Sequence, residues 1–364
     1  MAAKTTVALV FGGRSSEHAI SCATAGGVLS AIDRDRFDVI PVGVTRDGAF
    51  VLEQDDPGRF RLDPGALPGV VDNGSRVRFP ESVLSRELTV TDASGTTRSL
   101  GAVDIVFPIL HGPFGEDGTF QGMLELTGLP YVGNGVLASA LGMDKHFTKT
   151  VLEAAGIEVA PWVTITVSGW ARDSELWRGR ARSLGLPVFV KPARAGSSVG
   201  VSRVDDWDDL DVALATAFAE DGTALVEQAI VGREIECGVL GGRDGGEPRV
   251  SLAGEVIVGG GGFYDFAAKY LDAPGVELVC PAELNDGESW ELRCIAALAF
   301  EAIGGSELAR IALFLTPSGF VLNEINTMPG FTPISMFPKC WLASGLSYPD
   351  LIAELIELGL ETVR

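Results

Sequence analysis

The stretch FVKPARAGSSVGVSRV, residues 189–204, carries the clearest indication of the fold, because it reads as strand, glycine loop and strand. Lys191 ends the apolar first strand. The loop that follows contains two glycines and two serines, Gly196, Ser197, Ser198 and Gly200. Backbone amides and hydroxyls of such a loop can surround phosphate oxygens, and a lysine beside it supplies positive charge. The order of a Walker A loop is missing. The stretch predicts a phosphate site of another kind, with an ordinary glycine–serine loop as the alternative.

A second informative stretch is ARIALFLTPSGFVLNEIN, residues 309–326, which has the pattern of a hairpin with its turn at residues 317–319. Glu324 and Asn326 are two residues apart, so a strand directs both side chains to the same face. Paired oxygen ligands of this kind suit a hard divalent cation that would bridge the phosphates near Lys191. The alternative is a strand edge with two solvated polar residues.

The N-terminal part is predicted to be a parallel α/β unit. Strand-like residues 6–11 and 37–44 flank a helical pattern, and this order favours parallel strands. The glycines after the first strand lack the GxGxxG spacing, which argues against a nicotinamide-binding fold. Glu17 lies at the predicted helix start, where its carboxylate could bind an ammonium group or only favour the helix dipole. Residues 46–100 are polar and rich in turns, which suggests hairpins or an insertion.

The segment LHGPFGEDGTFQG, residues 110–122, follows another buried strand. It places His111, Glu116 and Asp117 at the carboxyl edge of the predicted parallel sheet, where ligand clefts of α/β proteins lie. A turn at Asp117-Gly118 would be ordinary. A packed-core histidine, however, seldom lies beside Gly-Pro.

The composition excludes several classes of partner. The chain has 364 residues and a net charge of −21, which argues against nucleic acid or an anionic membrane as a partner. No stretch approaches the length of a transmembrane helix, and the N-terminus lacks a signal-peptide pattern. Five scattered cysteines without a CxxC motif are interpreted as free thiols in a reducing cytoplasm.

Taken together, the motifs resemble those of the D-alanine–D-alanine ligases, members of the ATP-grasp superfamily. The segments that carry the resemblance are FGGRSSEHAIS, HGPFGEDGTFQG, MDKHFTK, FVKPARAGSSVGVSRV, VEQAIVGREIE, FYDFAAKYLD and NEINTMPGFTPISMFPK. The resemblance implies an α/β fold with an N-terminal Rossmann-like domain (1–105), a central region with the small ATP-grasp lobe (106–225) and a C-terminal ATP-grasp lobe (226–364). It also implies a cytoplasmic homodimer.

The same resemblance implies the reaction and the site residues. ATP would phosphorylate one D-alanine, and the amino group of a second D-alanine would then displace the phosphate. The expected catalytic residues are Glu17, Ser197, Tyr270, Arg310 and Gly330. The expected ATP-binding residues are Lys145, Lys191, Ser198, Glu227, Glu234 and Lys269. His111, Ser335 and Met336 are expected to bind D-alanine, and Glu324 and Asn326 to bind Mg²⁺ or Mn²⁺.

Lys269 and Tyr270 belong to a segment that is expected to act as a lid. An acyl phosphate hydrolyses unless water is excluded, so a closing loop over the site is expected. Four glycines, Gly259 to Gly262, precede this loop and could supply the freedom of a hinge.

One position departs from the family pattern. An aspartate two residues after the arginine is a metal ligand in the family, and this chain has Ala312 there. A lineage variant with a displaced ligand, an engineered substitution and a weakened or inactive enzyme are three explanations. We expect impaired turnover rather than lost nucleotide binding. A ligase forming D-Ala-D-lactate or D-Ala-D-serine and a nucleotide-binding pseudoenzyme are the rival functions; the AKY of residues 268–270 favours the dipeptide-forming enzymes.

Overall fold

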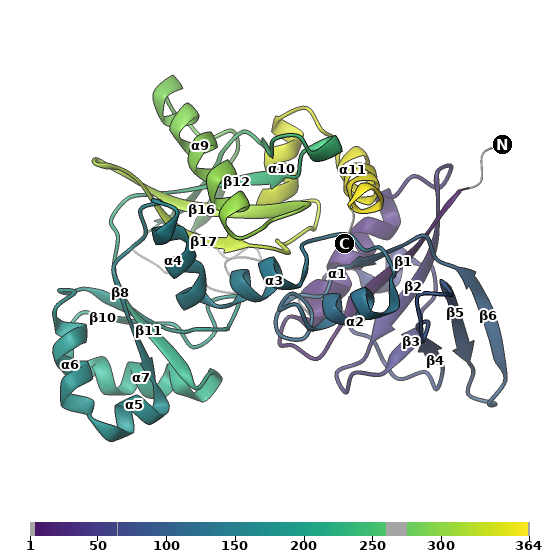
Figure 1. The fold of residues 1–364 in the computed structure, drawn as a ribbon, viewed down its shortest axis with the longest axis horizontal. Coiled ribbons are helices and arrows are strands. Elements are labelled where there is room, and N and C mark those ends of the chain that lie inside the picture. The colour runs from purple at the N-terminus through teal and green to yellow at the C-terminus, as the bar shows by residue number, and fades with distance from the viewer. Residues whose placement is uncertain (1–3, 64, 260–274, 363–364) are drawn as a thin grey trace.

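A computed structural model describes residues 4–63, 65–259 and 275–362. Its N-terminal part is a sheet in the order β3-β2-β1-β7, seen at the right of Figure 1. The strands are β1 (Thr5–Gly12), β2 (Phe37–Val44), β3 (Phe50–Leu52) and β7 (Ile105–Pro108). β1 pairs in parallel with β2 and β7, as the sequence predicted, while β3 is antiparallel to β2.

The elements around this sheet also agree with the sequence. Helix α1 (His18–Ala31) connects β1 to β2, and α2 (Thr119–Thr127) follows β7. Residues 46–100 contain the short 3-10 helix η1 (Pro57–Phe60) and an antiparallel sheet of β4 (Arg76–Arg78), β5 (Glu87–Thr91) and β6 (Thr97–Ala102). The predicted hairpins in this region are therefore confirmed.

A second sheet, in the order β10-β9-β11-β8, carries the glycine loop. Its strands are β8 (Trp162–Thr166), β9 (Val188–Pro192), β10 (Ser202–Val204) and β11 (Thr223–Gln228). The loop joins β9 to β10, so the predicted order of strand, loop and strand is confirmed. The accompanying helices are α3 (Val136–Met143), α4 (Lys145–Ala154), α5 (Val167–Arg172), α6 (Ser174–Arg182), η2 (Trp207–Asp209) and α7 (Leu210–Glu220).

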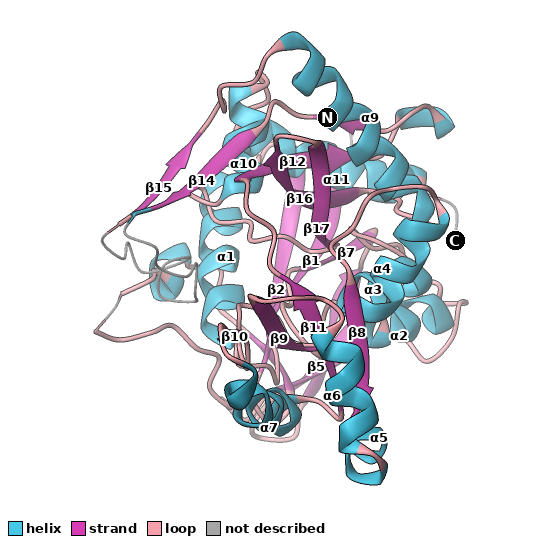
Figure 2. Cartoon of the chain, turned by 90° about the vertical axis from the view of Figure 1, so that its left-hand side faces the viewer, coloured by secondary structure: helices cyan, strands magenta, loops and turns pink. Residues whose placement is uncertain are grey.

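The third sheet, in the order β15-β14-β12-β16-β17, lies above the second sheet in Figure 2. Its strands are β12 (Arg233–Leu240), β13 (Arg249–Val250, paired with β12), β14 (Gly254–Val258), β15 (Val276–Val279), β16 (Leu308–Thr316) and β17 (Gly319–Asn326). It is accompanied by η3 (Arg243–Gly245), α9 (Asp286–Ala302) and α10 (Met336–Ala343). β16 and β17 form the predicted hairpin, in which Ala312 pairs with Glu324.

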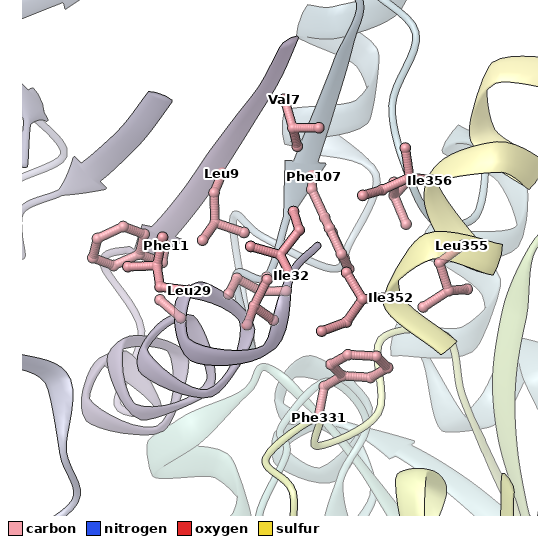
Figure 3. Packing of buried hydrophobic residues seen from close by; sticks show 14 of the residues in the cluster. Val7, Leu9, Phe11, Leu29, Ile32, Phe107, Phe331, Ile352, Leu355 and Ile356 are labelled. Carbon is pink, nitrogen blue, oxygen red and sulfur yellow. The ribbon is translucent and has the colours of Figure 1, made fainter. Parts of the chain in front are cut away.

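The C-terminal helix α11 (Tyr348–Glu361) packs its apolar side chains on the N-terminal sheet, while its Glu354 pairs with Arg249 of β13 in the third sheet. Figure 3 shows Ile352, Leu355 and Ile356 of this helix beside Phe107 and the side chains of β1. Burying these apolar side chains links the two ends of the chain. The domain boundaries at residues 105 and 225 stay a prediction.

Asn134 fixes the N-terminal part to the third sheet through its side chain. Its Nδ2 donates to the carbonyls of Leu308 (2.6 Å) and Thr327 (2.9 Å), and its Oδ1 accepts from the Ser306 amide (3.0 Å). The residue is buried, so water cannot replace these bonds. The neighbouring Gly133 amide donates to the buried carboxylate of Glu307 (2.6 Å). These contacts hold β16 and the end of β17 in place.

We predict that Asn134→Ala lowers the free energy of unfolding by roughly 3 kcal/mol, because it leaves buried backbone groups without partners. Asn73→Ala is the matched control: Asn73 also bonds backbone groups, of Leu52 and Ser75, but it is exposed and water can replace it. Urea denaturation of both variants measures the difference. Equal losses would contradict a structural role for Asn134.

Candidate active site

One cavity of about 310 Å³ lies where the three sheets meet. Its wall contains most of the residues that the sequence indicated: Glu17, His111, Lys145, Lys191, Ser197, Ser198, Glu227, Glu234, Arg310, Glu324, Asn326 and Gly330. Lys191 of β9 and Glu324 of β17 therefore line the same cavity. The fold brings them together from different sheets.

Glu17 lies at the end of the cavity formed by the N-terminal sheet. It is the N-cap residue of α1, and its side chain is buried. Ser197 of the glycine loop donates to Glu17 Oε1 (2.5 Å), so the contact expected between these two residues is present. A Cβ at Gly196 would lie 2.7 Å from Glu17 Oε2, which is too close for a side chain. A side chain at position 196 would therefore displace the Glu17 carboxylate.

Glu116 and His111 lie close to Glu17, and neither is in its ordinary electrostatic environment. Desolvation raises the pKa of Glu116 well above its usual range, and the nearby Glu17 carboxylate adds to this effect. Burial lowers the pKa of His111, opposed by Glu17 and by a hydrogen bond with the Met328 backbone. The His111 Nε2 is buried without a hydrogen-bond partner among the described residues. A neutral imidazole at this point can still donate to or accept from a ligand.

The second sheet and α4 supply the lysines. Lys191 Nζ lies 2.5 Å from Glu227 Oε1, and Lys149 Nζ lies 2.8 Å from Glu227 Oε2. Burial opposes ionisation of Glu227, but Lys191 and Lys149 outweigh it and lower the pKa of this carboxyl. Lys145 donates to the Ala195 carbonyl (2.7 Å), which holds its side chain beside the glycine loop. Asp144 caps α4 by accepting from the amides of His146 and Phe147, so Lys145 lies in the first turn.

The third sheet presents a row of polar side chains to the cavity. Arg310 and Ala312 of β16 pair with Asn326 and Glu324 of β17, and Ala312 pairs with Glu236 of β12 on its other side. Alternation along the strands places these five residues on the same face. The predicted proximity of positions 312 and 324 is confirmed.

Arg310 connects the carboxylates of this row. Its Nη2 donates to Glu324 Oε1 (2.8 Å), and its Nε lies 3.5 Å from Glu236 Oε1. Both Arg310 and Glu236 are largely shielded from solvent. The guanidinium is therefore held above the Ala312 position by charges on both neighbouring strands.

Some predicted site residues lie elsewhere. Ser335 caps α10, and its Oγ contacts Thr332 Oγ1 (2.7 Å). The Met336 side chain is buried against β14. Neither residue is part of the cavity wall. Lys269 and Tyr270, with most of the predicted lid, lie outside the described residues; at its described ends, the Gly259 amide donates to the Gly275 carbonyl (2.7 Å).

The balance of charge indicates what the cavity can hold. Among the described residues its wall carries the carboxyl groups of Glu17, Glu116, Glu227, Glu234 and Glu324, and the cationic groups of Lys145, Lys149, Lys191 and Arg310. When Glu116 is protonated, the four remaining carboxylates and the four cationic groups carry equal and opposite charge. A bound triphosphate would add negative charge that these described groups do not neutralise, and a divalent cation bound with it would offset that charge.

Glu324 and Asn326 fit such a cation, since both line the cavity and offer carboxylate and amide oxygens. No cluster of three or more His, Cys, Asp or Glu suited to a metal occurs in the described part of the chain. The protein thus offers two ligands in this row where a third could have stood at Ala312.

The sequence matches two protein-family models that together span most of the chain. The model described as D-ala D-ala ligase N-terminus matches residues 6–134, and the model described as D-ala D-ala ligase C-terminus matches residues 151–357. The chain belongs to the D-alanine–D-alanine ligase family.

Individual relatives agree with this assignment. The D-alanine–D-alanine ligase of Paenarthrobacter aurescens is 52% identical over 97% of this chain and 94% of that protein. The corresponding ligase of Kineococcus radiotolerans is 53% identical over 98% of this chain and 97% of its own length.

Solved structures of the family share the fold. The D-alanine–D-alanine ligase from Coxiella burnetii superposes with a TM-score of 0.78 at 34% identity, covering 98% of this chain and 94% of that chain. The VanG D-Ala:D-Ser ligase from Enterococcus faecalis superposes with a TM-score of 0.83 at 33% identity, covering 98% and 100%. The α/β fold class with an ATP-grasp fold is thereby confirmed. Among the described residues, no helix has both the length and the apolar character needed to cross a bilayer.

Two cavity residues were not assigned to the site from the sequence. Lys149 follows Lys145 by four residues in the MDKHFTK segment, so helical spacing places the two lysines on one face of α4. That spacing could have indicated Lys149. The sequence places Glu116 at the edge of the sheet, but its raised pKa arises from burial in the folded protein and from Glu17, which is distant in sequence.

We predict that Glu116→Gln makes the protein more stable than the parent at neutral pH. The folded parent keeps a proton on Glu116 above pH 4.3 or so, the ordinary glutamate pKa, while the unfolded chain loses it. Stability of the parent therefore falls as pH rises from that value toward the folded pKa. Glutamine can still accept from the Gly112 amide, which bonds Glu116 Oε1 (3.0 Å).

Thermal unfolding across the pH range measures this effect. The advantage of Glu116→Gln should shrink as the pH approaches the ordinary glutamate value. Glu153→Gln, an exposed position on α4, is the control and should change stability little. If Glu116→Gln is less stable than the parent at neutral pH, then the carboxylate is ionised and paired, contrary to our interpretation.

Proposed function

We propose that this protein is an ATP-dependent ligase that joins two D-alanines into D-alanyl-D-alanine through a D-alanyl phosphate, for the synthesis of peptidoglycan precursors. One observation carries the proposal: a single cavity combines a buried carboxylate at a helix N-terminus, a glycine loop with lysines and a carboxylate–amide pair. The family assignment and the names of the relatives support the same reaction.

Each part of the cavity suits one part of the substrates. Glu17, oriented by Ser197, would bind the ammonium of the first D-alanine, and His111 would contact the same molecule. Lys145, Lys191 and Ser198 would hold the ATP phosphates, with Lys269 completing the set from the predicted lid. Glu227 and Glu234 would contact adenine and ribose. Because the amino acids are small, charge-assisted bonds must provide most of their binding energy.

The reaction would proceed in two substitutions. A carboxylate oxygen of the first D-alanine attacks the γ-phosphorus of ATP, and the bond from that phosphorus to the bridging oxygen breaks to release ADP. The amino group of the second D-alanine attacks the acyl carbon, loses a proton and expels phosphate. Addition of the amino group to the acyl carbon gives a tetrahedral oxyanion before phosphate leaves. Arg310, held by Glu324, would stabilise this oxyanion together with the Gly330 amide. Tyr270 would join Ser197 and Glu17 in the closed site, and Ser335 and Met336 would position the second D-alanine.

A divalent cation bound at Glu324 and Asn326 would neutralise charge on the transferred phosphoryl group. We propose Mg²⁺, with Mn²⁺ as a substitute. We also propose that the protein acts in the cytoplasm as a homodimer; sedimentation velocity tests the oligomeric state, and a single species of monomer mass would contradict it.

Two other functions are alternatives to the proposed one, and an experiment can separate them. The VanG D-Ala:D-Ser ligase has a similar structure, so D-serine is a rival second substrate. Ala312 motivates a nucleotide-binding pseudoenzyme. Phosphate release and mass spectrometry of the product, with Mg-ATP and D-alanine alone or with D-serine or D-lactate, separate these functions. We expect D-alanyl-D-alanine as the main product. ATP binding without D-alanine-dependent phosphate release would indicate the pseudoenzyme.

We predict that Ala312→Asp raises metal-dependent turnover, whereas Glu324→Ala nearly abolishes it. Ala312 is buried between Glu236 and Glu324. A carboxylate there would supply a third protein ligand. It would adjoin the carboxylates of Glu236 and Glu324, and the single charge of Arg310 offsets only part of their repulsion, so a bound divalent cation would offset more of it. The variant should therefore also show a larger Mg²⁺-dependent increase in its melting temperature in the presence of ATP.

Ala312→Asn is the control for this prediction, since asparagine has a similar shape without the charge. It should give a smaller increase in both turnover and Mg²⁺-dependent melting temperature. If Ala312→Asp leaves metal titration and turnover unchanged, the cation has another ligand and our interpretation of this position is wrong.

A further inference from the structure

Two cysteines meet on the side of the third sheet where β14 and β15 contact α10. Cys280 lies one residue after the end of β15, and Cys340 lies within α10. They belong to a small apolar cluster with Val256 and Met336. Neither cysteine lines the cavity.

The two sulfur atoms are already close. Cys280 Sγ and Cys340 Sγ are 3.9 Å apart, although the residues are sixty positions apart in the chain. A disulfide bond is about 2.05 Å long, so the two sulfur atoms have to move closer together before they can bond. Gly254 of β14 permits the approach of α10, because a Cβ there would lie 2.2 Å from Met336 Sδ and 3.3 Å from Cys340 Sγ.

The surroundings give the two thiols different roles. Cys280 is half-buried, so small oxidants can reach it, whereas Cys340 is buried. The hydrogen bond with Cys340 lowers the pKa of Cys280 despite its partial burial, and Lys339 adds to this effect. The same contact raises the pKa of Cys340. A reactive, reachable thiol next to a second thiol is the arrangement found in redox-sensitive pairs.

The other cysteines lack a lowered thiol pKa, a described contact with a second thiol, or both. Burial raises the pKa of Cys22 to about 12 and raises that of Cys237 as well. Cys294 is exposed on α9, and no thiol contact is described for it. The Cys280–Cys340 pair thus differs from the other cysteines in the short distance between its sulfur atoms and in the lowered pKa of Cys280.

We propose that Cys280 and Cys340 form a reversible disulfide when the protein meets a hydroperoxide. The Cys280 thiolate attacks one peroxide oxygen, the O–O bond breaks, and a sulfenic acid and hydroxide result. The Cys340 thiol, losing its proton, attacks the Cys280 sulfur and expels the sulfenic acid oxygen as water, while the hydroxide takes up the proton that Cys280 had released. Two thiols and one hydrogen peroxide thus give one disulfide and two waters. A dithiol reductant reverses the change.

The bond would restrain the structure beside the active site, since Val258 both lines the cavity and packs against the cysteine cluster. It would tie β15 to α10, whose first residue is Met336 and whose cap is Ser335. This consequence rests on the proposed function, in which these two residues position the second D-alanine. Oxidation is expected to shift the start of α10, raise the KM for that substrate and reduce phosphate release.

Peptide mapping tests the disulfide directly. The reduced full-length protein is treated with hydrogen peroxide, alkylated and digested without reductant. We expect a linked peptide pair containing Cys280 and Cys340 that disappears after reduction. In Cys340→Ser, Cys280 should instead be trapped as a sulfenic acid by a dimedone probe, a result that also shows the variant has kept its reactive site. Cys294→Ser is the matched control and should still form the link.

Activity is measured separately on the same samples. Loss of phosphate release on oxidation, recovered by reductant and absent in Cys280→Ser, is the expected result. Formation of the link without any change in the KM for D-alanine would overturn the regulatory consequence but leave the disulfide established, whatever the enzyme's substrate. Peroxide-treated protein in which Cys280 and Cys340 stay reduced, or oxidise without becoming linked, while Cys294 reacts would overturn the disulfide itself.

Discussion

Electrostatic repulsion between carboxylates is the constraint on which the arrangement of the cavity depends. Glutamates from all three sheets or their loops converge there, in a chain whose net charge is already −21. The structure reduces this repulsion in two ways, by pairing carboxylates with cationic side chains and by raising the pKa of a carboxyl group. Glu227 has a lowered pKa because Lys149 and Lys191 flank it, whereas Glu116 has a raised pKa because burial desolvates it and Glu17 is near. Arg310 separates Glu236 from Glu324 in the third sheet.

The same constraint explains how an acidic protein can bind an anionic nucleotide. Its overall field repels a triphosphate, so local groups must overcome that repulsion at short range. Lysines on the second sheet and α4 line the same cavity as the side-chain oxygens of Glu324 and Asn326 on β17, an arrangement suited to holding phosphates together with a cation. Ala312 supplies no oxygen ligand in this row, although Glu236 and Glu324 pair with it from the two neighbouring strands.

The sequence predicted those features that depend on local patterns. The strand, glycine loop and strand around Lys191, the hairpin that pairs positions 312 and 324, and the place of Glu17 at a helix start follow from short-range periodicity and turn residues. Contacts between distant segments could not be predicted in this way. The Asn134 hydrogen bonds span more than 170 positions, and α11 returns to a sheet formed at the other end of the chain. The raised pKa of Glu116 and the approach of Cys280 to Cys340 could not be predicted from the sequence either, because each arises only after distant segments have packed together.

We propose that the cavity between the second and third sheets is the nucleotide site, with a cation at Glu324 and Asn326. A crystal structure of the protein with Mg²⁺ and a non-hydrolysable ATP analogue tests this proposal most directly. We expect the triphosphate between Lys191 and Glu324, the adenine near Glu227 and density for a cation touching both Glu324 and Asn326. A nucleotide bound outside this cavity, or a cation coordinated by neither residue, would contradict it.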